Sequence, residues 1–115
     1  MTGVLLAVGD DVFRAGLAML VDADPDLRVA GQVDTAAALP AALAKARPDV
    51  LLLDLQLPGL DAEEQTREAA AATRVVLLAR FVRDDDIDAA LVAGASGFVT
   101  RTATPEQILA ALRAG

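Results

Sequence analysis

Asp54 is the residue of this chain whose position best suits chemistry. It closes the apolar run Val50-Leu51-Leu52-Leu53 and is followed at once by Leu55-Gln56-Leu57-Pro58-Gly59. The apolar run predicts a buried strand, and a carboxylate at its carboxyl end costs free energy unless a site uses it or a partner satisfies it. Asp54 is therefore either an acceptor in phosphoryl chemistry or a structural group that caps a turn and pairs with a cation.

Other kinds of active site lack their residues. The chain has no His and no Cys, which excludes His-based triads, Cys nucleophiles and the usual transition-metal clusters. The stretch Val8-Gly9-Asp10-Asp11 after the first apolar run has neither dinucleotide-binding nor Walker glycine spacing. We therefore do not expect an independent enzyme.

Length and composition describe one small acidic domain. The chain has 115 residues, 55% of them hydrophobic and 3% aromatic, so one core of Leu, Val and Ala is expected. The net charge of −7 argues against direct binding of nucleic acid by these residues. No apolar run approaches the roughly 20 residues of a membrane span. The start, Met1-Thr2-Gly3, lacks the basic region of a signal peptide, so we expect the apolar stretch after it to be a strand. The absence of Cys fits a cytoplasmic location.

Strand-like and helix-like segments alternate five times. The expected strands are Val4–Val8, Leu27–Val33, Val50–Asp54, Val75–Ala79 and Gly97–Thr100. The expected helices cover 11–23, 35–47, 61–72, 84–94 and 104–114. Three continuously apolar strands indicate a parallel sheet covered on both faces, and the alternating pattern of Leu27–Val33 favours an edge strand. The pattern predicts a doubly wound α/β domain of the (βα)5 type.

Helix-end signals agree with this scheme. Asp10 or Asp11 can cap the first helix, and Thr104 precedes a proline at the start of the last one. Gly94 suits a left-handed stop after the fourth helix. In a doubly wound sheet, ligands bind outside the carboxyl ends of the strands. The candidate site therefore draws on the ranges 8–11, 54–59, 79–81 and 100–102.

Several short motifs follow one another in a specific order. They are Arg14-Ala15-Gly16-Leu17, Asp24-Pro25-Asp26-Leu27, Arg47-Pro48-Asp49-Val50, Leu52-Leu53-Asp54-Leu55-Gln56-Leu57-Pro58-Gly59 and Gly94-Ala95-Ser96-Gly97-Phe98. Over essentially the whole chain they resemble the receiver domain of bacterial two-component response regulators of the NarL/LuxR type. The resemblance implies a flavodoxin/CheY-like sheet of strand order 2-1-3-4-5. It also implies a regulatory domain in which Asp54 accepts a phosphoryl group from a histidine kinase, with Mg²⁺ bound.

The pocket departs from this family at four positions. The two acids that end the first strand and help to hold Mg²⁺ correspond to Val8 and Gly9. The hydroxyl residue that ends the fourth strand corresponds to Ala79, and the Lys that ends the fifth corresponds to Arg101. Of the usual pocket, only the acceptor position, Asp54, is unchanged.

Charge counting predicts a pocket without metal. A pocket with three carboxylates and one Lys needs a divalent cation to relieve repulsion, whereas Asp54 facing Arg101 is neutral. One carboxylate is a weak Mg²⁺ site, so we expect no cofactor. Arg101 can form a bidentate ion pair with Asp54, and Arg80 is a second candidate partner.

An alternative reading restores the metal. If the first strand shifts by about two residues, Asp10 and Asp11 replace the missing acids, and Asp10, Asp11, Asp54 and the Gln56 carbonyl hold Mg²⁺. The simpler reading is that Asp10 and Asp11 cap the first helix, where negative charge suits the N-terminus.

The aromatic residues concern the switch. The resemblance implies a switch in which the hydroxyl of the fourth strand moves onto the phosphoryl group and an aromatic residue of the fifth strand rotates inward with it. Phe98 matches that aromatic residue, but Ala79 has no hydroxyl to move. We therefore expect Phe98 to hold one rotamer fixed by packing. Phe13 and Phe98 are expected in the core, and Phe81 lies on a loop next to the pocket.

Two functions follow from the resemblance. The first is a degenerate receiver that acts through protein contacts, homodimerisation or a small ligand. The second is an ordinary phosphoprotein receiver served by a histidine kinase. Residues 1–115 are expected to be the receiver, excised or stand-alone, and DNA binding is expected only through a helix-turn-helix domain outside this chain. Partner surfaces in the family involve the first, fourth or fifth helix, and the sequence does not choose among them.

Overall fold

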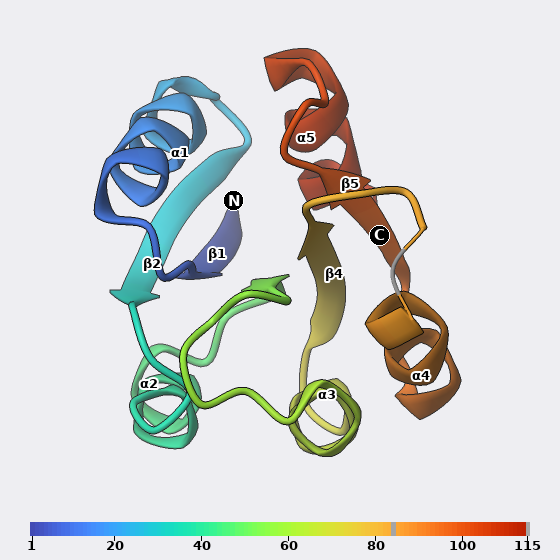
Figure 1. Ribbon diagram of the computed structural model, residues 1–115. Coiled ribbons are helices and arrows are strands. Elements are labelled where there is room, and N and C mark those ends of the chain that lie inside the picture. Colours follow the sequence, from blue (N-terminus) through green and yellow to red (C-terminus); the bar gives the residue numbers. More distant parts are fainter. Residues whose placement is uncertain (84, 115) are drawn as a thin grey trace.

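One five-stranded parallel sheet organises the chain (Figure 1). The computed structural model describes residues 1–83 and 85–114, so the expected helix start at Asp84 lies outside the described residues. The strands are β1 (Thr2–Ala7), β2 (Leu27–Val33), β3 (Val50–Asp54), β4 (Arg74–Ala79) and β5 (Gly97–Thr100). The helices are α1 (Asp11–Ala23), α2 (Leu39–Ala46), α3 (Ala62–Ala70), α4 (Asp85–Ala93) and α5 (Pro105–Arg113). The order β2-β1-β3-β4-β5 confirms the predicted topology, and β2 is an edge strand as expected.

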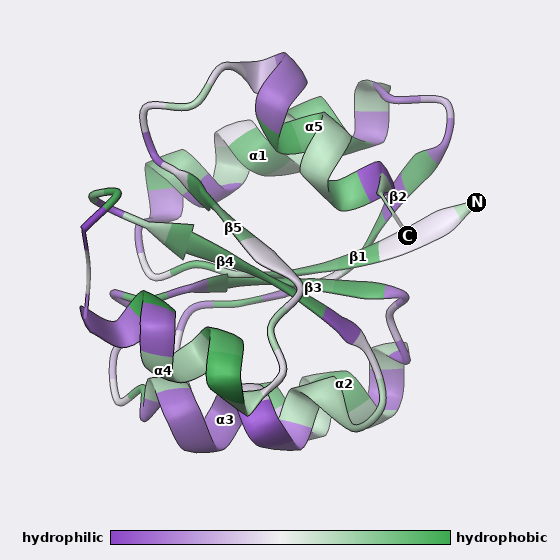
Figure 2. Cartoon of the chain, turned by 90° about the vertical axis from the view of Figure 1, so that its right-hand side faces the viewer, coloured by the Kyte–Doolittle hydropathy of each residue, from purple (hydrophilic) through white to green (hydrophobic). Residues whose placement is uncertain are grey.

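Helices cover both faces of the sheet (Figure 2). Helices α1 and α5 pack on one face, and α2, α3 and α4 pack on the other. Because side chains alternate between the faces of a strand, the apolar strands β1, β3 and β4 feed both cores. The α1/α5 core contains Val4, Leu6, Leu52, Leu78 and Leu112, and the opposite core contains Leu5, Leu51, Leu53, Leu77 and Ile87.

Local signals set most helix ends. Asp10 is the N-cap of α1. Thr104 and Gln107 form a reciprocal capping box at the start of α5. Gly94 follows α4 with a φ of +124°, as the left-handed stop predicted. Helix α2 begins at Leu39 instead of residue 35, because Pro40 favours the first helical turn and cannot continue an earlier one.

Within residues 1–83 and 85–114, no helix is both long enough and apolar enough to cross a membrane.

Candidate functional site

The Asp54 carboxylate lies at the carboxyl edge of the sheet and is satisfied by backbone donors. Its side chain belongs to a residue only 2% exposed. The Gly9 N–H donates to Oδ2 at 3.2 Å, and the Gln56 N–H donates to Oδ1 at 2.8 Å. A buried carboxylate with a donor on each oxygen is stable without a cation partner.

A tight turn after β3 closes the pocket from one side. The Leu60 N–H donates to the Leu57 carbonyl at 3.1 Å, and Gly59 takes a φ of +81°, which suits a type II turn with Pro58 before it. The Ala36 N–H donates to the Pro58 carbonyl at 2.9 Å and fixes the turn. A β-carbon on Gly9 would stand 2.9 Å from Cδ of Pro58. The position that corresponds to a metal acid therefore faces a proline ring.

Asp10 and Asp11 serve the start of α1. Asp10 Oδ1 accepts the Phe13 N–H at 3.0 Å. This hydrogen bond, and to a smaller extent the charge of Arg101, lower the pKa of the Asp10 carboxyl below its ordinary value. Asp11 pairs with Arg14 at 2.8 Å, and Arg14 also donates to the Val8 carbonyl at 2.8 Å. These contacts fit the helix-capping reading, and no shift of the first strand brings either acid into the place of Val8 or Gly9.

Arg101 has a different partner from the one expected. Its backbone N–H donates to the Ala79 carbonyl at 3.0 Å, and its guanidinium reaches Asp10 Oδ2 at 3.8 Å. The guanidinium carbon lies 4.5 Å from the centre of the Phe13 ring, within cation–π range. Between the described residues Arg101 and Asp54 no ion pair forms, so the predicted Asp54–Arg101 pair is wrong.

Two further pocket positions lie at the end of β4. Arg80 is exposed after β4 and forms no ion pair with Asp54 in the described structure. Ala79 ends β4 fully buried. In the described part of the chain, no three Asp or Glu side chains gather as a metal-binding group. With Val8 and Gly9 at the positions of the family's metal acids, Asp54 offers Mg²⁺ a poorer donor set than three acids would, since the ion prefers octahedral oxygen ligation.

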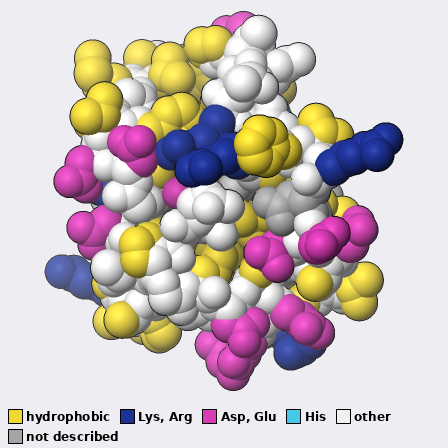
Figure 3. Space-filling model, viewed as in Figure 1, with side chains coloured by type: hydrophobic (Ala, Val, Ile, Leu, Met, Phe, Trp, Pro, Cys, Tyr) yellow, Lys and Arg dark blue, Asp and Glu magenta, His cyan; other side chains and the backbone are white. Residues whose placement is uncertain are grey.

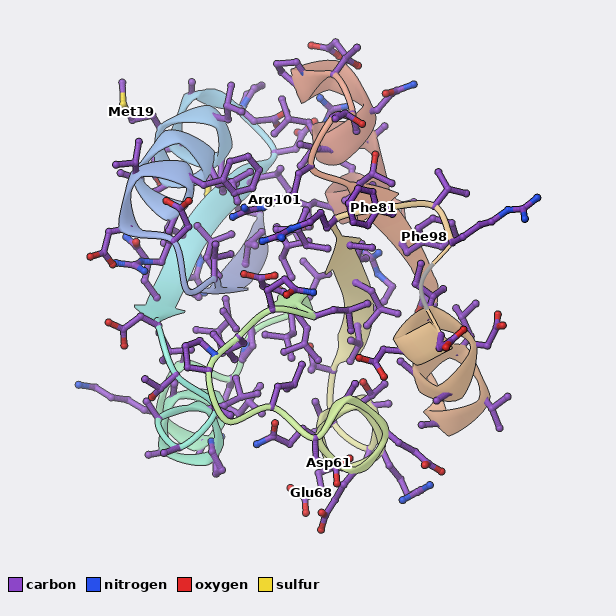
Figure 4. The ribbon with its side chains drawn as sticks, viewed as in Figure 1. Met19, Asp61, Glu68, Phe81, Phe98 and Arg101 are labelled. Carbon is purple, nitrogen blue, oxygen red and sulfur yellow. The ribbon has the colours of Figure 1, made fainter. Side chains whose placement is uncertain are left out.

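The three aromatic residues lie in different environments, and Figure 4 labels two of them, Phe81 and Phe98. Phe13 is partly buried and packs against the α1/α5 core, as expected. Phe98 on β5 is 38% exposed, so its predicted place in the core is wrong. The reason is that β5 is the second edge strand, and the Phe98 side chain faces a groove that it shares with Val82 and Leu91. Phe81 is largely exposed on the loop after β4.

Charge is distributed unevenly around the site (Figure 3). Basic side chains gather between α1 and β5, where Arg101 lies, and acidic side chains gather over α3 and α4. The first turn of α4 carries Asp85, Asp86 and Asp88. At the mouth of the pocket, however, these basic side chains stand beside acids, because Arg101 lies near Asp10 and Arg14 pairs with Asp11.

Sequence reasoning missed the residues that close the pocket. The candidate range 54–59 included Pro58, but its contact with Gly9 was not predicted. Phe13 beneath Arg101 and Arg14 on the Val8 carbonyl were not predicted as site residues. The one available signal was a glycine at a position where the family has an acid, which can indicate close approach of another group. The partner of that glycine depends on the conformation of two loops, which the sequence does not state.

The fold and site define a class: a doubly wound domain with a carboxylate at the end of its central strand. Comparison with known proteins identifies the family. Residues 4–113 match the response regulator receiver domain, and the chain belongs to this family.

Relatives with curated names are regulators of transcription. The chain is 30% identical to the transcriptional regulatory protein LiaR of Bacillus subtilis, covering 99% of this chain and 56% of that protein. It is 36% identical to the DNA-binding transcriptional activator DevR/DosR of Mycobacterium tuberculosis, covering 88% of this chain and 48% of the relative. The chain thus spans about half the length of the relatives it matches.

A solved structure agrees closely with the fold. The signal receiver domain of the response regulator NarL from Mycobacterium tuberculosis superposes with a TM-score of 0.86 at 25% identity, covering 99% of this chain and 98% of that one.

Proposed function

We propose that this receiver is degenerate: it transmits a signal through protein contacts, without phosphorylation of Asp54 and without Mg²⁺. The observation that carries the proposal is the contact of Gly9 with Asp54 and Pro58. The Gly9 N–H occupies one oxygen of the carboxylate, and the space for a side chain at Gly9 is filled by the proline ring. Phosphoryl transfer depends on positioning and on charge neutralisation by metal, so a pocket without metal acids is a poor acceptor site.

The rest of the pocket supports the same proposal. Ala79 carries no hydroxyl to follow a phosphoryl group. Arg101 contacts Phe13 and Asp10, and among the described residues it forms no ion pair with the acceptor Asp54. These contacts favour one fixed conformation over a two-state switch.

The names of the curated relatives support an inference about the kind of protein that carries this domain. We infer a cytoplasmic transcription regulator of the NarL/LuxR type, in which this domain is regulatory and not an enzyme. DNA binding would belong to a C-terminal domain outside these residues, and a homodimer is the natural active form. A histidine kinase is the expected partner only under the alternative function, in which Asp54 is phosphorylated with Mg²⁺ bound.

Intact-mass spectrometry tests the proposal. The chain is incubated with Mg²⁺ and a small phosphodonor such as acetyl phosphate, and no phosphoryl adduct is expected. An adduct that disappears in Asp54→Asn would establish the ordinary receiver instead. A Mg²⁺ titration followed by thermal unfolding is a second measurement, since a ligand that binds the native state raises Tm. We expect Tm to stay unchanged.

A further inference from the structure

Arg74, at the start of β4, is a partly buried cation without an acidic partner. The other partly buried arginines each contact an acid: Arg14 reaches Asp11 at 2.8 Å, and Arg101 reaches Asp10 at 3.8 Å. Among the described residues Arg74 forms no ion pair, and burial lowers the pKa of its guanidinium below the ordinary value. A partly desolvated charge gains free energy when an opposite charge approaches it, so this side chain can receive an anion.

The present contacts of Arg74 use only part of its guanidinium. The side chain caps the end of α5, donating to the Ala111 carbonyl at 2.9 Å and to the Leu112 carbonyl. The C-terminus of a helix carries only about half a negative charge, so these carbonyls neutralise the cation in part. A guanidinium has more N–H donors than these two bonds use, so a carboxylate can still bind beside them.

A groove of about 420 Å³ opens beside Arg74, between β5 and the last turn of α5, and its volume is in the range of small-molecule sites. Figure 2 shows β5 at the near edge of the sheet with α5 above it. Phe98 and Ala111 give the groove apolar walls, and Phe98 is 38% exposed. At Gly97 the groove is open, since a β-carbon there would meet no atom within 4 Å. The hydroxyl of Ser96, which also lines the groove, has no hydrogen-bond partner among the described residues.

We propose that this groove binds a small organic acid that joins a carboxylate to an apolar body of about the size of an aromatic ring. The carboxylate pairs with the Arg74 guanidinium and accepts a hydrogen bond from the Ser96 hydroxyl. The apolar body packs against Phe98 and Ala111, where ring stacking and the removal of apolar surface from water favour it. Because the groove joins β4, β5 and α5, the bound acid holds the end of α5 to the sheet.

Charge and size favour this occupant over others. An amine would bring a second positive charge next to Arg74 in a partly desolvated place, which is unfavourable. The net charge of −7 repels anions from the chain in general, so an acid binds where an unneutralised cation and a fitted groove coincide. A stable protein partner needs roughly 800 Å² of surface on each side, whereas the groove is formed by a few side chains at one edge of the sheet.

Nuclear magnetic resonance titration of the isotope-labelled 115-residue chain tests the inference with probes that share one apolar body. The probes are phenylacetate, phenethyl alcohol and phenethylamine, which carry a negative charge, no charge and a positive charge. Phenylacetate should shift the backbone amides of Ser96, Gly97, Phe98 and Ala111 to saturation, with a Kd of about 1–10 mM for a ligand of this size. Phenethyl alcohol should bind at least about fivefold more weakly because it forms no ion pair, and phenethylamine should not bind.

Substitutions place the bound acid in the groove. Arg74→Gln should weaken phenylacetate binding at least about tenfold, because the ion pair is lost. Since that change also removes a cap of α5, Gly97→Val is the second variant: its side chain enters the groove at a point where a β-carbon meets no atom of the chain. It should abolish binding without lowering Tm, because valine suits a strand. Arg47→Gln, the same change at an exposed arginine after α2, is the matched control and should bind phenylacetate like wild type.

Three results would overturn the inference: no saturable shift with phenylacetate, binding of phenethylamine at least as tight, or wild-type affinity in Gly97→Val. A groove that serves a protein partner would give the first of these results. The inference goes beyond the proposed function, because it concerns a groove at the opposite end of β4 from Ala79. Phosphorylation of Asp54 is measured separately by mass, so either proposal can fail without the other.

Discussion

Gly9 and Pro58 are in contact across the mouth of the pocket, with 2.9 Å between the site of a β-carbon on Gly9 and Cδ of Pro58. The contact joins the loop after β1 to the loop after β3. It makes glycine the residue that fits at position 9, and it excludes an acid there unless the proline moves. Glycine at position 9, where the family has an acid, is therefore accompanied by a close contact that leaves little room for a side chain.

The first prediction concerns this contact. Gly9→Ala should destabilise the chain by about 1–3 kcal/mol, because an added methyl group must displace the proline ring or the loop. In a Pro58→Ala background the same change should cost much less, because the obstructing ring is gone. Urea unfolding of the four chains in the cycle measures the coupling.

The matched control for this cycle is Gly16→Ala, where a β-carbon meets nothing within 4 Å. It should stabilise the chain by about 1 kcal/mol through helix propensity. Equal effects of Gly9→Ala in the presence and absence of Pro58 would contradict the predicted contact.

The second prediction separates a structural Asp54 from a strained functional one. Asp54→Ala leaves the part-buried Gly9 and Gln56 N–H groups without their protein acceptor, at a cost of about 1–3 kcal/mol. Asp54→Asn retains one acceptor oxygen and should cost about half as much. Denaturant unfolding gives both values. An Asp54→Ala chain more stable than wild type would instead indicate a carboxylate kept for function at the expense of stability.

The third prediction concerns the stacking of Arg101 on Phe13. Arg101→Lys keeps the charge but loses the planar guanidinium, and Phe13→Leu keeps an apolar side chain but loses the ring. Each should cost about 0.5–1 kcal/mol, and the double variant should cost less than their sum, because both remove the same cation–π contact. Thermal unfolding of the three variants measures this coupling. Strict additivity would show that the 4.5 Å contact contributes nothing.

The elements were predictable because their signals are local. The strand Leu27–Val33 and the helix 11–23 match β2 and α1 residue for residue, since alternation, helical spacing and caps act within a few residues. The pocket was predictable only in part. Asp54 was expected to be buried. Arg101 was assigned as its cationic partner because Arg101 follows the end of the fifth strand in the sequence. The loop after β1 places Asp10 nearer to Arg101, and no sequence pattern reports the geometry of that loop.

The exposure of Phe98 is a second feature that local sequence signals did not predict. Its residue type and strand suggested the core, whereas β5 is an edge strand whose outer side is open. Burial of a strand residue depends on which helices cover the sheet edge, and this is a property of the whole fold.

The last prediction is a pH dependence that arises away from the pocket. Arg113 at the end of α5 donates two hydrogen bonds to Asp24, at 2.9 and 2.7 Å, and so ties α5 to the C-terminus of α1. These bonds, followed by the N–H of Asp26, lower the pKa of the Asp24 carboxyl below its ordinary 3.8. Because the folded-state pKa lies below the unfolded-state value, the pair stabilises the chain above about pH 4, and the contribution is lost as the pH falls through the folded-state pKa.

Asp24→Asn removes this charge while keeping an oxygen that can accept the Asp26 N–H. We expect the variant to have a lower Tm than wild type at pH 7. We also expect a smaller fall in Tm between pH 5 and about pH 2, because the lowered pKa of the Asp24 carboxyl no longer contributes to the pH dependence of stability. Differential scanning calorimetry over that range gives both. Glu63→Gln is the control: its ion pair with Arg67 is exposed on both sides, so its profile should follow wild type. An Asp24→Asn profile parallel to wild type would mean that Arg113 leaves the Asp24 pKa unchanged.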